Sequence, residues 1–430
     1  MTIALLFAGF LGLLFLGVPV AFSLGIPTMF YFFLQDSFVP IEFMPHCMTS
    51  PLFNYVLVAL PAFLLSGRMM NTSGVTDRIF DAAIALVGRF RGGLAHANVF
   101  ASILFATMSG TAVGDAGGLG QVEMRMMNKA GYRTAFSAGI SAASPIVGPI
   151  IPPSVAMVIL GASAEISIGR LFLGGVFPGL MLGFALMINV GLRAHFTAEG
   201  RTWPVEKIPL KKAVNSCWRA LLPMFCPVII VGGIILGVVT PTEAAVLAIN
   251  YAFLLGIIYR EMTWKKLWQT LEETIASVGV FMYIVAIASF FTWVVTREGF
   301  PMVIKALLTP LITFNPTVAL LLILAFLLFL GCFLDVTPAI LLLAPILIPI
   351  VRSLGIDVVH FGVFMTMALC IGIVTPPFGM CLFVLSDVAQ IPVKDVTKEA
   401  ILYVPAMIIV TLLVIFFPQI ILWLPNKVFG

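Results

Sequence analysis

Residues 144–155 read SPIVGPIIPPSV and place four prolines within twelve residues. They lie inside a stretch, from Ala138 to Leu160, that contains no charged residue. Such a stretch is long enough to span a membrane as a helix, but an interior proline costs a helix about 3 kcal/mol or more. The sequence therefore predicts a membrane-spanning segment that is broken near its centre, and the break needs a functional explanation.

The composition indicates whether the chain folds in water or in a membrane. The chain is 61% hydrophobic and 10% charged, with a mean hydropathy of +1.14. Soluble domains are typically about 45–50% apolar and about 25% charged. Apolar runs recur along the chain, so an all-α polytopic membrane protein is expected. The first run, residues 3–34, is interrupted at Gly17-Val18-Pro19 and forms either one bent span or two short ones. It lacks a basic n-region and is expected to be retained.

Other apolar runs predict the remaining spans. These are expected at 51–70, 138–162, 171–192, 219–239, 243–260, 274–296, 361–386 and 401–424. Two further runs, 95–122 and 317–351, are interrupted near their centres by Gly or Pro and are predicted to be re-entrant hairpins. Two amphipathic segments, 74–93 and 262–274, are expected to be interfacial helices with charge on one face and Trp or Phe on the other.

The distribution of basic residues supports the two hairpins. If both hairpins return to the side from which they came, 18 Lys and Arg share one side and only five lie on the other. Converting either hairpin into a span destroys this segregation. By the positive-inside rule the basic side of this multi-pass protein is cytoplasmic.

The broken span has a second copy. Pro376-Pro377, in CIGIVTPPFGMCLFVLSD (370–387), lies 224 positions after Pro152-Pro153. A similar shift matches Gly74 with Gly299, and Thr111 with Thr337 within two positions. Three spans separate the copies, so the second is expected to be inverted. The predicted organisation is 1–50 scaffold helices, 51–162 first repeat, 163–262 central scaffold helices and cytoplasmic loop, 263–386 second repeat, and 387–430 C-terminal helix.

Inverted repeats with paired broken helices are typical of secondary transporters. In hydrocarbon an unpaired backbone N–H or carbonyl costs several kcal/mol, so unwound backbone survives only within protein or beside a water-filled cavity. Prolines leave carbonyl oxygens of the preceding turn unpaired, and these can coordinate a hard cation such as Na⁺. The N-termini of half-helices favour a carboxylate at the same depth. Each break is therefore predicted to be a binding site.

Polar residues within the apolar segments are the candidates for this site. Ser109-Gly110-Thr111 at the first hairpin tip offers hydroxyl groups for an ion, although its small residues also suit helix packing. Asp115 lies at hydrocarbon depth and is either a substrate-binding residue or a structural hydrogen-bonding group. Asp335 and Thr337 take the corresponding place in the second hairpin.

Two other motifs lie outside the hairpins. Thr240-Pro241-Thr242-Glu243 fits a capping box, with Glu243 reaching back to Thr240, and a structural role is expected. Arg297 ends an uncharged run near the second hairpin. It either pairs with a substrate carboxylate or anchors the helix at the interface with Glu298.

Several alternative functions are weighed against transport. The six cysteines form no C-x-x-C and no metal-ligand spacing, and only four histidines are present, so packing cysteines and no resident metal cluster are expected. A membrane enzyme needs a constellation such as clustered His, Asp and Glu, which the sequence does not supply. A channel usually shows filter motifs or rings of charge. A one-component carboxylate transporter or ion antiporter stays open as an alternative.

Five motifs in order resemble the large membrane subunit (DctM type) of tripartite ATP-independent periplasmic (TRAP) transporters. They are SGTAVGDAGGLG (109–120), GPIIPPS (148–154), GVVTPTEAA (237–245), FLDVTPAILLLAPILIP (333–349) and GIVTPPFGMCLFV (372–384). The resemblance covers nearly the whole chain. It implies an ion-transporter-superfamily fold that works as an elevator and carries a carboxylate with at least two Na⁺ ions. It also implies a periplasmic substrate-binding protein and a small four-helix membrane subunit, expected here as a separate chain. No nucleic-acid partner is expected.

The resemblance also assigns site residues. One sodium site is implied at the first hairpin tip with Ser144, Gly148, Pro149 and Pro152, and the other at Asp335 and Thr337 with Gly372, Thr375 and Pro376. Asp115, Arg297 and Ser154 are expected to bind the substrate. The family handles C4-dicarboxylates, sialic acid and other sugar acids. The Gly-lined tip DAGGLG favours a larger sugar acid such as sialic acid, with a C4-dicarboxylate as the alternative.

Overall fold

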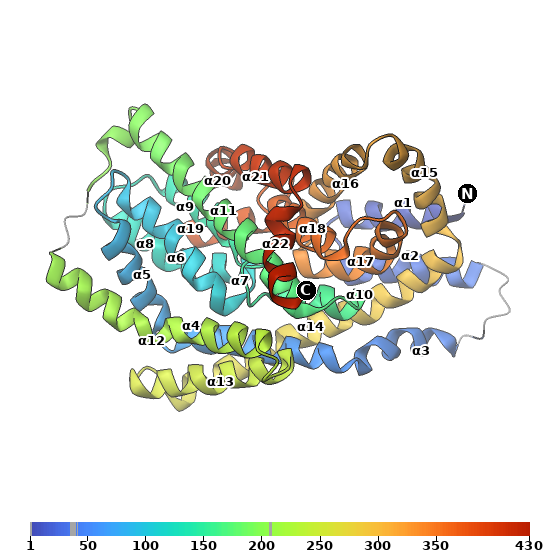
Figure 1. Cartoon of the computed structure of the whole chain (residues 1–430), viewed down its shortest axis with the longest axis horizontal. Helices are drawn as coiled ribbons and strands as arrows, with labels where there is room; N and C mark the ends of the chain where they lie inside the picture. Colours follow the sequence, from blue (N-terminus) through green and yellow to red (C-terminus); the bar gives the residue numbers. More distant parts are fainter. Residues whose placement is uncertain (1, 35–39, 41, 206–208) are drawn as a thin grey trace.

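The computed structural model describes residues 2–34, 40, 42–205 and 209–430. In this part of the chain the secondary structure consists of helices joined by turns and short loops, with no β-strand (Figure 1). The all-α fold is confirmed. The N-terminal run forms two helices, α1 (Thr2–Phe15) and α2 (Val20–Leu34), which pack against each other. They are separated at Gly17, whose φ of +80° lies in the left-handed region that glycine adopts without steric cost.

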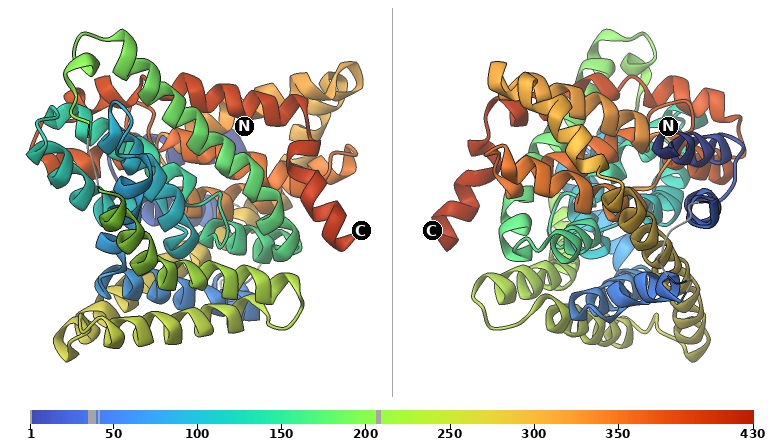
Figure 2. Two further views of the ribbon diagram at one scale, coloured as in Figure 1. Left: turned by 60° about the vertical axis from the view of Figure 1, so that its left-hand side comes forward. Right: turned by 90° about the vertical axis from the view of Figure 1, so that its right-hand side faces the viewer.

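Helices α4, α12 and α13 lie along the bottom of the molecule in Figure 1, with α5 at the left and α14 extending to the right. We call α4, α5, α12, α13 and α14 the scaffold. Helix α4 packs against α13 and α14, α5 packs against α12, and α12 packs against α13. Figure 2 shows α12 and α13 side by side along one edge of the molecule. The bounds are α4 (Ala59–Thr72), α5 (Val75–Val87), α12 (Leu210–Ile235), α13 (Pro241–Ile258) and α14 (Trp264–Arg297).

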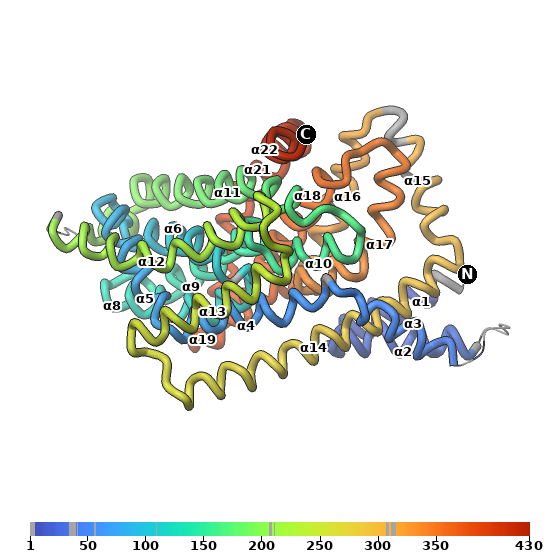
Figure 3. The backbone as a smooth tube through the Cα atoms, turned by 60° about the horizontal axis from the view of Figure 1, so that its bottom comes forward, coloured from blue at the N-terminus to red at the C-terminus, as the bar shows by residue number. Residues whose placement is uncertain are grey.

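Two details of the scaffold differ from the sequence-based prediction. Residues 262–274 do not form a separate interfacial helix, because α14 runs without a break from Trp264 to Arg297, as Figure 3 shows. The predicted span 51–70 begins with short turns of 3₁₀-helix before α4 starts. These turns are η1 (Ser50–Phe53) and η2 (Tyr55–Val58), and they follow α3 (Phe43–Thr49).

The two interrupted runs each form two arms with a break between them. The first hairpin consists of α6 (Gly93–Ser109), α7 (Ala112–Gly117) and α8 (Leu119–Lys129). The second consists of α16 (Pro316–Gly331) and α17 (Val336–Ser353). Both breaks fall where the sequence predicts them.

Both proline-rich segments are broken helices. The first comprises α9 (Thr134–Ala143), η3 (Ser144–Val147) and α10 (Val155–Ala164), with non-helical backbone at 148–154. The second comprises α18 (Val358–Gly372) and α19 (Met380–Ala389), with turns between them. The Pro152–Pro153 and Pro376–Pro377 peptide bonds are both cis.

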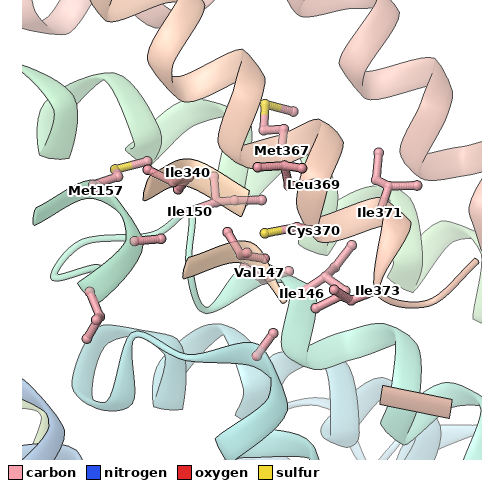
Figure 4. Close-up of a cluster of buried hydrophobic side chains, with 14 of the residues drawn as sticks. Ile146, Val147, Ile150, Met157, Ile340, Met367, Leu369, Cys370, Ile371 and Ile373 are labelled. Atoms are coloured by element: carbon pink, nitrogen blue, oxygen red, sulfur yellow. The ribbon is translucent and has the colours of Figure 1, made fainter. Parts of the chain in front are cut away.

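Hairpins and broken helices pack together reciprocally, and we call these four pieces the core. In the first half α8 packs on α9, and in the second α16 packs on α18. Across the halves α10 packs on α17 and α19 packs on α7. Figure 4 shows Ile146, Val147 and Ile150 of the first broken helix in one apolar cluster with Ile340 and Met367 of the second half. Burial of this shared cluster holds the core together as one body.

The remaining helices surround the core. Helix α11 (Ile168–Phe196) packs along α6, α21 and α22. The last predicted span, 401–424, is not one helix, because the chain leaves the helical conformation at Phe417 before Pro418. It forms α21 (Val404–Phe416) and α22 (Gln419–Phe429), and α20 (Val393–Ala400) precedes them. The other elements are η4 (Gly200–Thr202) and α15 (Phe300–Phe314).

Helix length agrees with a membrane protein. Among the described residues, five helices are long and apolar enough to cross a membrane, or six if the bent pair Val393–Ala400 and Val404–Phe416 is one span. The matched glycines of the predicted repeat both lie at helix junctions in the left-handed region, with φ of +73° at Gly74 and +71° at Gly299. The inverted relation of the halves stays a prediction.

Candidate functional site

A cavity of about 480 Å³ lies between the scaffold and the core. On the core side it is lined by both hairpins, through Thr111 and Asp115 of the first and Asp335 and Thr337 of the second. On the scaffold side α4 and α14 line it. The breaks of the two hairpins, which are far apart in the sequence at Thr111 and Thr337, therefore face the same cavity.

The first hairpin tip lies against the first proline break. Gly110 has φ of +65°, and a Cβ atom there would lie 2.8 Å from the Pro153 carbonyl oxygen and 2.9 Å from the Val155 nitrogen. Only glycine fits this close approach. A Cβ atom on Gly148 would lie 3.1 Å from Oδ2 of Asp115, so that carboxyl lies directly over the unwound backbone. The predicted meeting of hairpin tip and broken helix is present.

The second hairpin meets the second break in the same way. The Gly379 nitrogen donates to the Cys332 carbonyl across 2.9 Å, and Gly331 packs directly on Gly372. Asp335 precedes the first residue of α17 and makes no capping hydrogen bond to it. Thr337 in the first turn of α17 is 5% exposed and lines the cavity.

A buried polar network joins the first hairpin to its broken helix. Oγ of Ser144 donates to Oδ1 of Asn98 across 2.8 Å, and Nδ2 of Asn98 donates to Glu123 and to Ser141, each across 2.7 Å. All four residues are fully buried. Both amide hydrogens of Asn98 and its carbonyl oxygen are therefore used, and Ser144 is fixed by the hairpin itself.

The predicted site residues divide into two groups. Six of them line the cavity: Gly110, Thr111, Asp115, Pro149, Asp335 and Thr337. Their hydroxyl, carboxyl and carbonyl oxygens are the donors that a hard cation takes, so the residues present fit Na⁺. Ser109 ends α6, but its side chain lies outside the described part of the structure.

Seven other predicted residues lie at the two proline breaks but are not among the residues that line the cavity. Ser154 is fully buried; its Oγ donates to the Pro149 carbonyl across 2.5 Å and accepts from the Met157 nitrogen as the cap of α10. Thr375 donates to the Ile371 carbonyl across 2.7 Å. The remaining members of this group are Ser144, Gly148, Pro152, Gly372 and Pro376. The hydroxyl of Ser154 is thus committed within its own turn, which does not favour a substrate contact.

Arg297 is not brought to the cavity. Its guanidinium lies 5.3 Å from the centre of the Trp293 ring, at the C-terminal end of α14. Ser277 of the same helix lines the cavity, and twenty residues of α-helix separate the two positions by about 30 Å. This position fits the interfacial-anchor alternative and does not favour contact with a substrate in the cavity.

Residues of the scaffold were missed by the sequence reasoning. Arg68 and Thr72 of α4, and Glu273 and Ser277 of α14, line the cavity. Nη1 of Arg68 donates to Oε2 of Glu273 across 2.8 Å, and Nη2 donates to Oγ of Ser277 across 2.7 Å. A signal for them exists, because each pair is spaced i, i+4 and therefore shares one face of a largely apolar helix.

The cavity continues toward the basic side of the molecule. Asn71, Thr72 and Glu273 also line an adjoining space of about 350 Å³. That space is bordered by Asp77 of α5 and by Lys266 near the start of α14. These residues belong to the side that carries most Lys and Arg, so the opening lies on the side predicted to be cytoplasmic.

The predicted capping box is present at the start of α13. Oγ1 of Thr240 accepts from the Glu243 nitrogen, and the Glu243 carboxylate accepts from the Thr240 nitrogen across 2.8 Å. Pro241 occupies the first turn, where its missing N–H costs nothing. This motif begins a scaffold helix, and its residues are not among those that line the cavity.

Known proteins resemble this chain along its whole length. The chain is 43% identical to the sialic acid TRAP transporter large permease protein SiaM of Vibrio cholerae, over 98% of each chain. It is 38% identical to the sialic acid TRAP transporter permease protein SiaT of Haemophilus influenzae, over 96% of this chain and 67% of that one. It is 36% identical to the C4-dicarboxylate TRAP transporter large permease protein DctM of Vibrio cholerae, over 100% and 99%.

The fold has a solved counterpart. The crystal structure of the YdaH transporter of Alcanivorax borkumensis superposes with a TM-score of 0.61, covering 95% of this chain and 97% of that one at 14% sequence identity. This likeness shows the fold alone. The model of the tripartite ATP-independent periplasmic transporter DctM component matches residues 7–420. The chain therefore belongs to the DctM component family of tripartite ATP-independent periplasmic transporters, and it is a transport protein, not an enzyme.

Proposed function

We propose that this chain is the large membrane subunit of a Na⁺-coupled importer of a carboxylate, with sialic acid as the substrate. The observation that carries the proposal is the single cavity that both polar hairpin tips line. One space lined by oxygen donors from both breaks can hold coupled cations beside an anion, which neither break alone provides.

Two sodium sites are assigned within the core. Thr111 with the first break would hold one ion, and Asp335 and Thr337 with the second break would hold the other. Hydroxyl and backbone oxygens would hold the first ion, and the Asp335 carboxyl would join such oxygens around the second. Bound cations also offset the negative charge of Asp115 and Asp335, which otherwise repels an anionic substrate.

The transport step is proposed to be an elevator movement. The core is held together by reciprocal packing across its halves, and the cavity lies between it and part of α4 and α14. Elsewhere α4 contacts α6 and α10, and α14 contacts α17, so the movement would exchange these contacts for others. Movement of the core along the scaffold would carry the cavity from one membrane face to the other. The cavity continues toward the basic side, which corresponds to an inward-facing state.

Sialic acid is favoured over a C4-dicarboxylate by the relatives. The 43% identity to a large permease named for sialic acid exceeds the 36% identity to one named for C4-dicarboxylates. The words 'tripartite', 'periplasmic' and 'large permease' in these names support two partners, a small membrane subunit and a periplasmic substrate-binding protein. We place the assembly in a bacterial inner membrane.

Uptake by the reconstituted complex tests the proposal. The chain and a small subunit are placed in proteoliposomes with a sialic-acid-loaded binding protein outside, and labelled N-acetylneuraminate is followed with an inward Na⁺ or K⁺ gradient. Uptake should require both Na⁺ and the binding protein, and unlabelled succinate should not compete. Equal uptake in K⁺ would contradict sodium coupling, and uptake without a binding protein would favour the one-component alternative.

A further inference from the structure

The charges around the cavity are unbalanced. Among the described residues that line it, three carry carboxyl groups: Asp115, Asp335 and Glu273. Arg68 supplies the one Lys or Arg side chain in the same set. A carboxylate substrate entering this space meets more negative than positive charge, so the position of Arg68 determines where its carboxylate can be stabilised.

Arg68 lines the cavity on its scaffold side, next to the adjoining space that leads toward the basic side. It lines the larger space, and its partner Glu273 lines both that space and the adjoining one. The Arg68 side chain is 35% exposed and that of Glu273 is 51% exposed. The pair is therefore open to the cavity, and one partner can be exchanged without unpacking either helix.

The partners of Arg68 have the geometry of a carboxylate receptor. The two terminal nitrogens of its guanidinium each donate one hydrogen bond, Nη1 to Oε2 of Glu273 and Nη2 to Oγ of Ser277. A guanidinium is suited to donate two parallel hydrogen bonds to one carboxylate. The second oxygen of Glu273 accepts from Nε2 of Gln269 across 3.0 Å, which holds Glu273 on α14 when Arg68 turns to another anion.

We infer that Arg68 binds the carboxylate of the transported anion in the inward-facing cavity, and that Glu273 occupies Arg68 when the substrate is absent. The exchange replaces one carboxylate by another on the same guanidinium. Glu273 thus competes with the substrate and favours its release into the cytoplasm. This inference rests on the proposed function and adds a substrate-binding residue and an internal competitor to it.

The alternative is a purely structural role, in which the pair ties α4 to α14. The two roles make opposite predictions for matched single variants. If Arg68 binds substrate, Arg68→Gln should weaken N-acetylneuraminate binding at least tenfold, whereas Glu273→Gln should strengthen it about two- to fivefold because the competitor loses its charge. If the ion pair only connects α4 to α14, both variants should change N-acetylneuraminate binding in the same direction.

The experiment measures N-acetylneuraminate binding to the purified complex of the chain with a small subunit, in saturating Na⁺, by calorimetry. The methyl ester of N-acetylneuraminate, which lacks the charge, should bind wild type and Arg68→Gln alike. The double variant Arg68→Glu/Glu273→Arg restores an ion pair between the helices but should stay weak toward N-acetylneuraminate.

Failure of this inference is distinguishable from failure of the proposed function. Opposite effects of the two single variants, with a weak double variant, support the inference. Weakening by both single variants with recovery in the double variant would overturn it and assign the pair to structure. If wild type shows no Na⁺-dependent binding of N-acetylneuraminate, the proposed function fails first, and Arg68 receives no substrate to bind.

Discussion

Ser144 of the first broken helix donates a hydrogen bond to Asn98 of the first hairpin, with 2.8 Å between Oγ and Oδ1. The bond joins two segments 46 residues apart and lies at the point where α9 gives way to η3. Through Asn98 it extends to the buried Glu123. The position of the break is thus set by side chains of the hairpin as well as by its prolines.

Replacement of Asn98 by Leu should loosen this junction. The change leaves Ser144 and Glu123 without their partner in a buried setting, which costs about 1–3 kcal/mol for each unsatisfied group. We expect a lower melting temperature in detergent and a higher Na⁺ concentration for half-maximal uptake. Asn250→Leu, at an exposed position of α13, is the matched control. Equal effects of the two variants would contradict a special role of Asn98.

A methyl group at Gly110 should separate the hairpin tip from the break. The Cβ atom of Gly110→Ala would lie 2.8 Å from the Pro153 carbonyl oxygen. Gly131→Ala is the control, because Gly131 also has positive φ, +91°, but a Cβ atom there meets nothing within 4 Å. Both changes carry a backbone cost of about 1 kcal/mol. Uptake should be lost only in Gly110→Ala, and normal uptake by that variant would show that the contact is dispensable.

Loss of the hydroxyl group of Thr111 or Thr337 should weaken Na⁺ binding more than it lowers the stability of the fold. Thr111→Val and Thr337→Val keep the shape of each side chain and remove one oxygen donor. We expect each variant to need several-fold more Na⁺ for half-maximal uptake, with little change in melting temperature. Thr317→Val, at a partly exposed position in the first turn of α16 and away from the cavity, should behave as wild type. Unchanged sodium dependence in both variants would remove these hydroxyls from the ion sites.

Glu399 should contribute to stability away from the cavity. Its carboxylate accepts from Nη2 of Arg133 across 2.8 Å and from Nη2 of Arg193 across 2.6 Å, and Arg193 is only 14% exposed. Glu399→Ala leaves Arg193 poorly paired and should cost about 3 kcal/mol. Asp395→Ala breaks an exposed pair with Lys398 and should cost less than about 1 kcal/mol. Thermal unfolding in detergent compares the two, and similar shifts would contradict the difference in burial.

The sequence predicted the breaks because their chemistry is local. Proline removes a backbone donor and glycine admits φ values closed to other residues, so the break near Pro152 and the turn at Gly110 could both be inferred without a structure. The continuous helix α14, which begins at Trp264, could not be inferred in this way. Charged residues at 265–273 suggested a separate surface helix, but a helix that projects beyond the apolar layer continues without a break.

The scaffold side of the cavity required the structure. From the sequence, Arg68 is one of the basic residues on the side predicted to be cytoplasmic, because nothing in the local sequence shows that α4 and α14 lie together. Arg297 was attractive because it ends an apolar run, yet its distance along α14 keeps it from the cavity. The i, i+4 spacing within α4 and within α14 marks a polar face on each helix, but pairing between Arg68 and Glu273, 205 residues apart, depends on tertiary packing.

The elevator movement makes a testable distinction between two cross-links. A Cβ atom on Gly118 of the core would lie 2.6 Å from Nδ2 of Asn71 on α4, so Asn71→Cys/Gly118→Cys can join core to scaffold. A Cβ atom on Gly117 would lie 3.6 Å from Cγ1 of Val384 on α19, so Gly117→Cys/Val384→Cys joins two parts of the core. Each single-cysteine variant serves as its own control for oxidation.

Na⁺-driven N-acetylneuraminate uptake before and after oxidation of these two pairs tests the central claim most directly. If the core moves as one body along the scaffold, the Asn71–Gly118 cross-link should stop uptake and reduction should restore it, while the Gly117–Val384 cross-link should leave uptake unchanged. Full uptake with core and scaffold joined, or loss of uptake only when the core is joined to itself, would contradict the elevator and indicate gating by the hairpins.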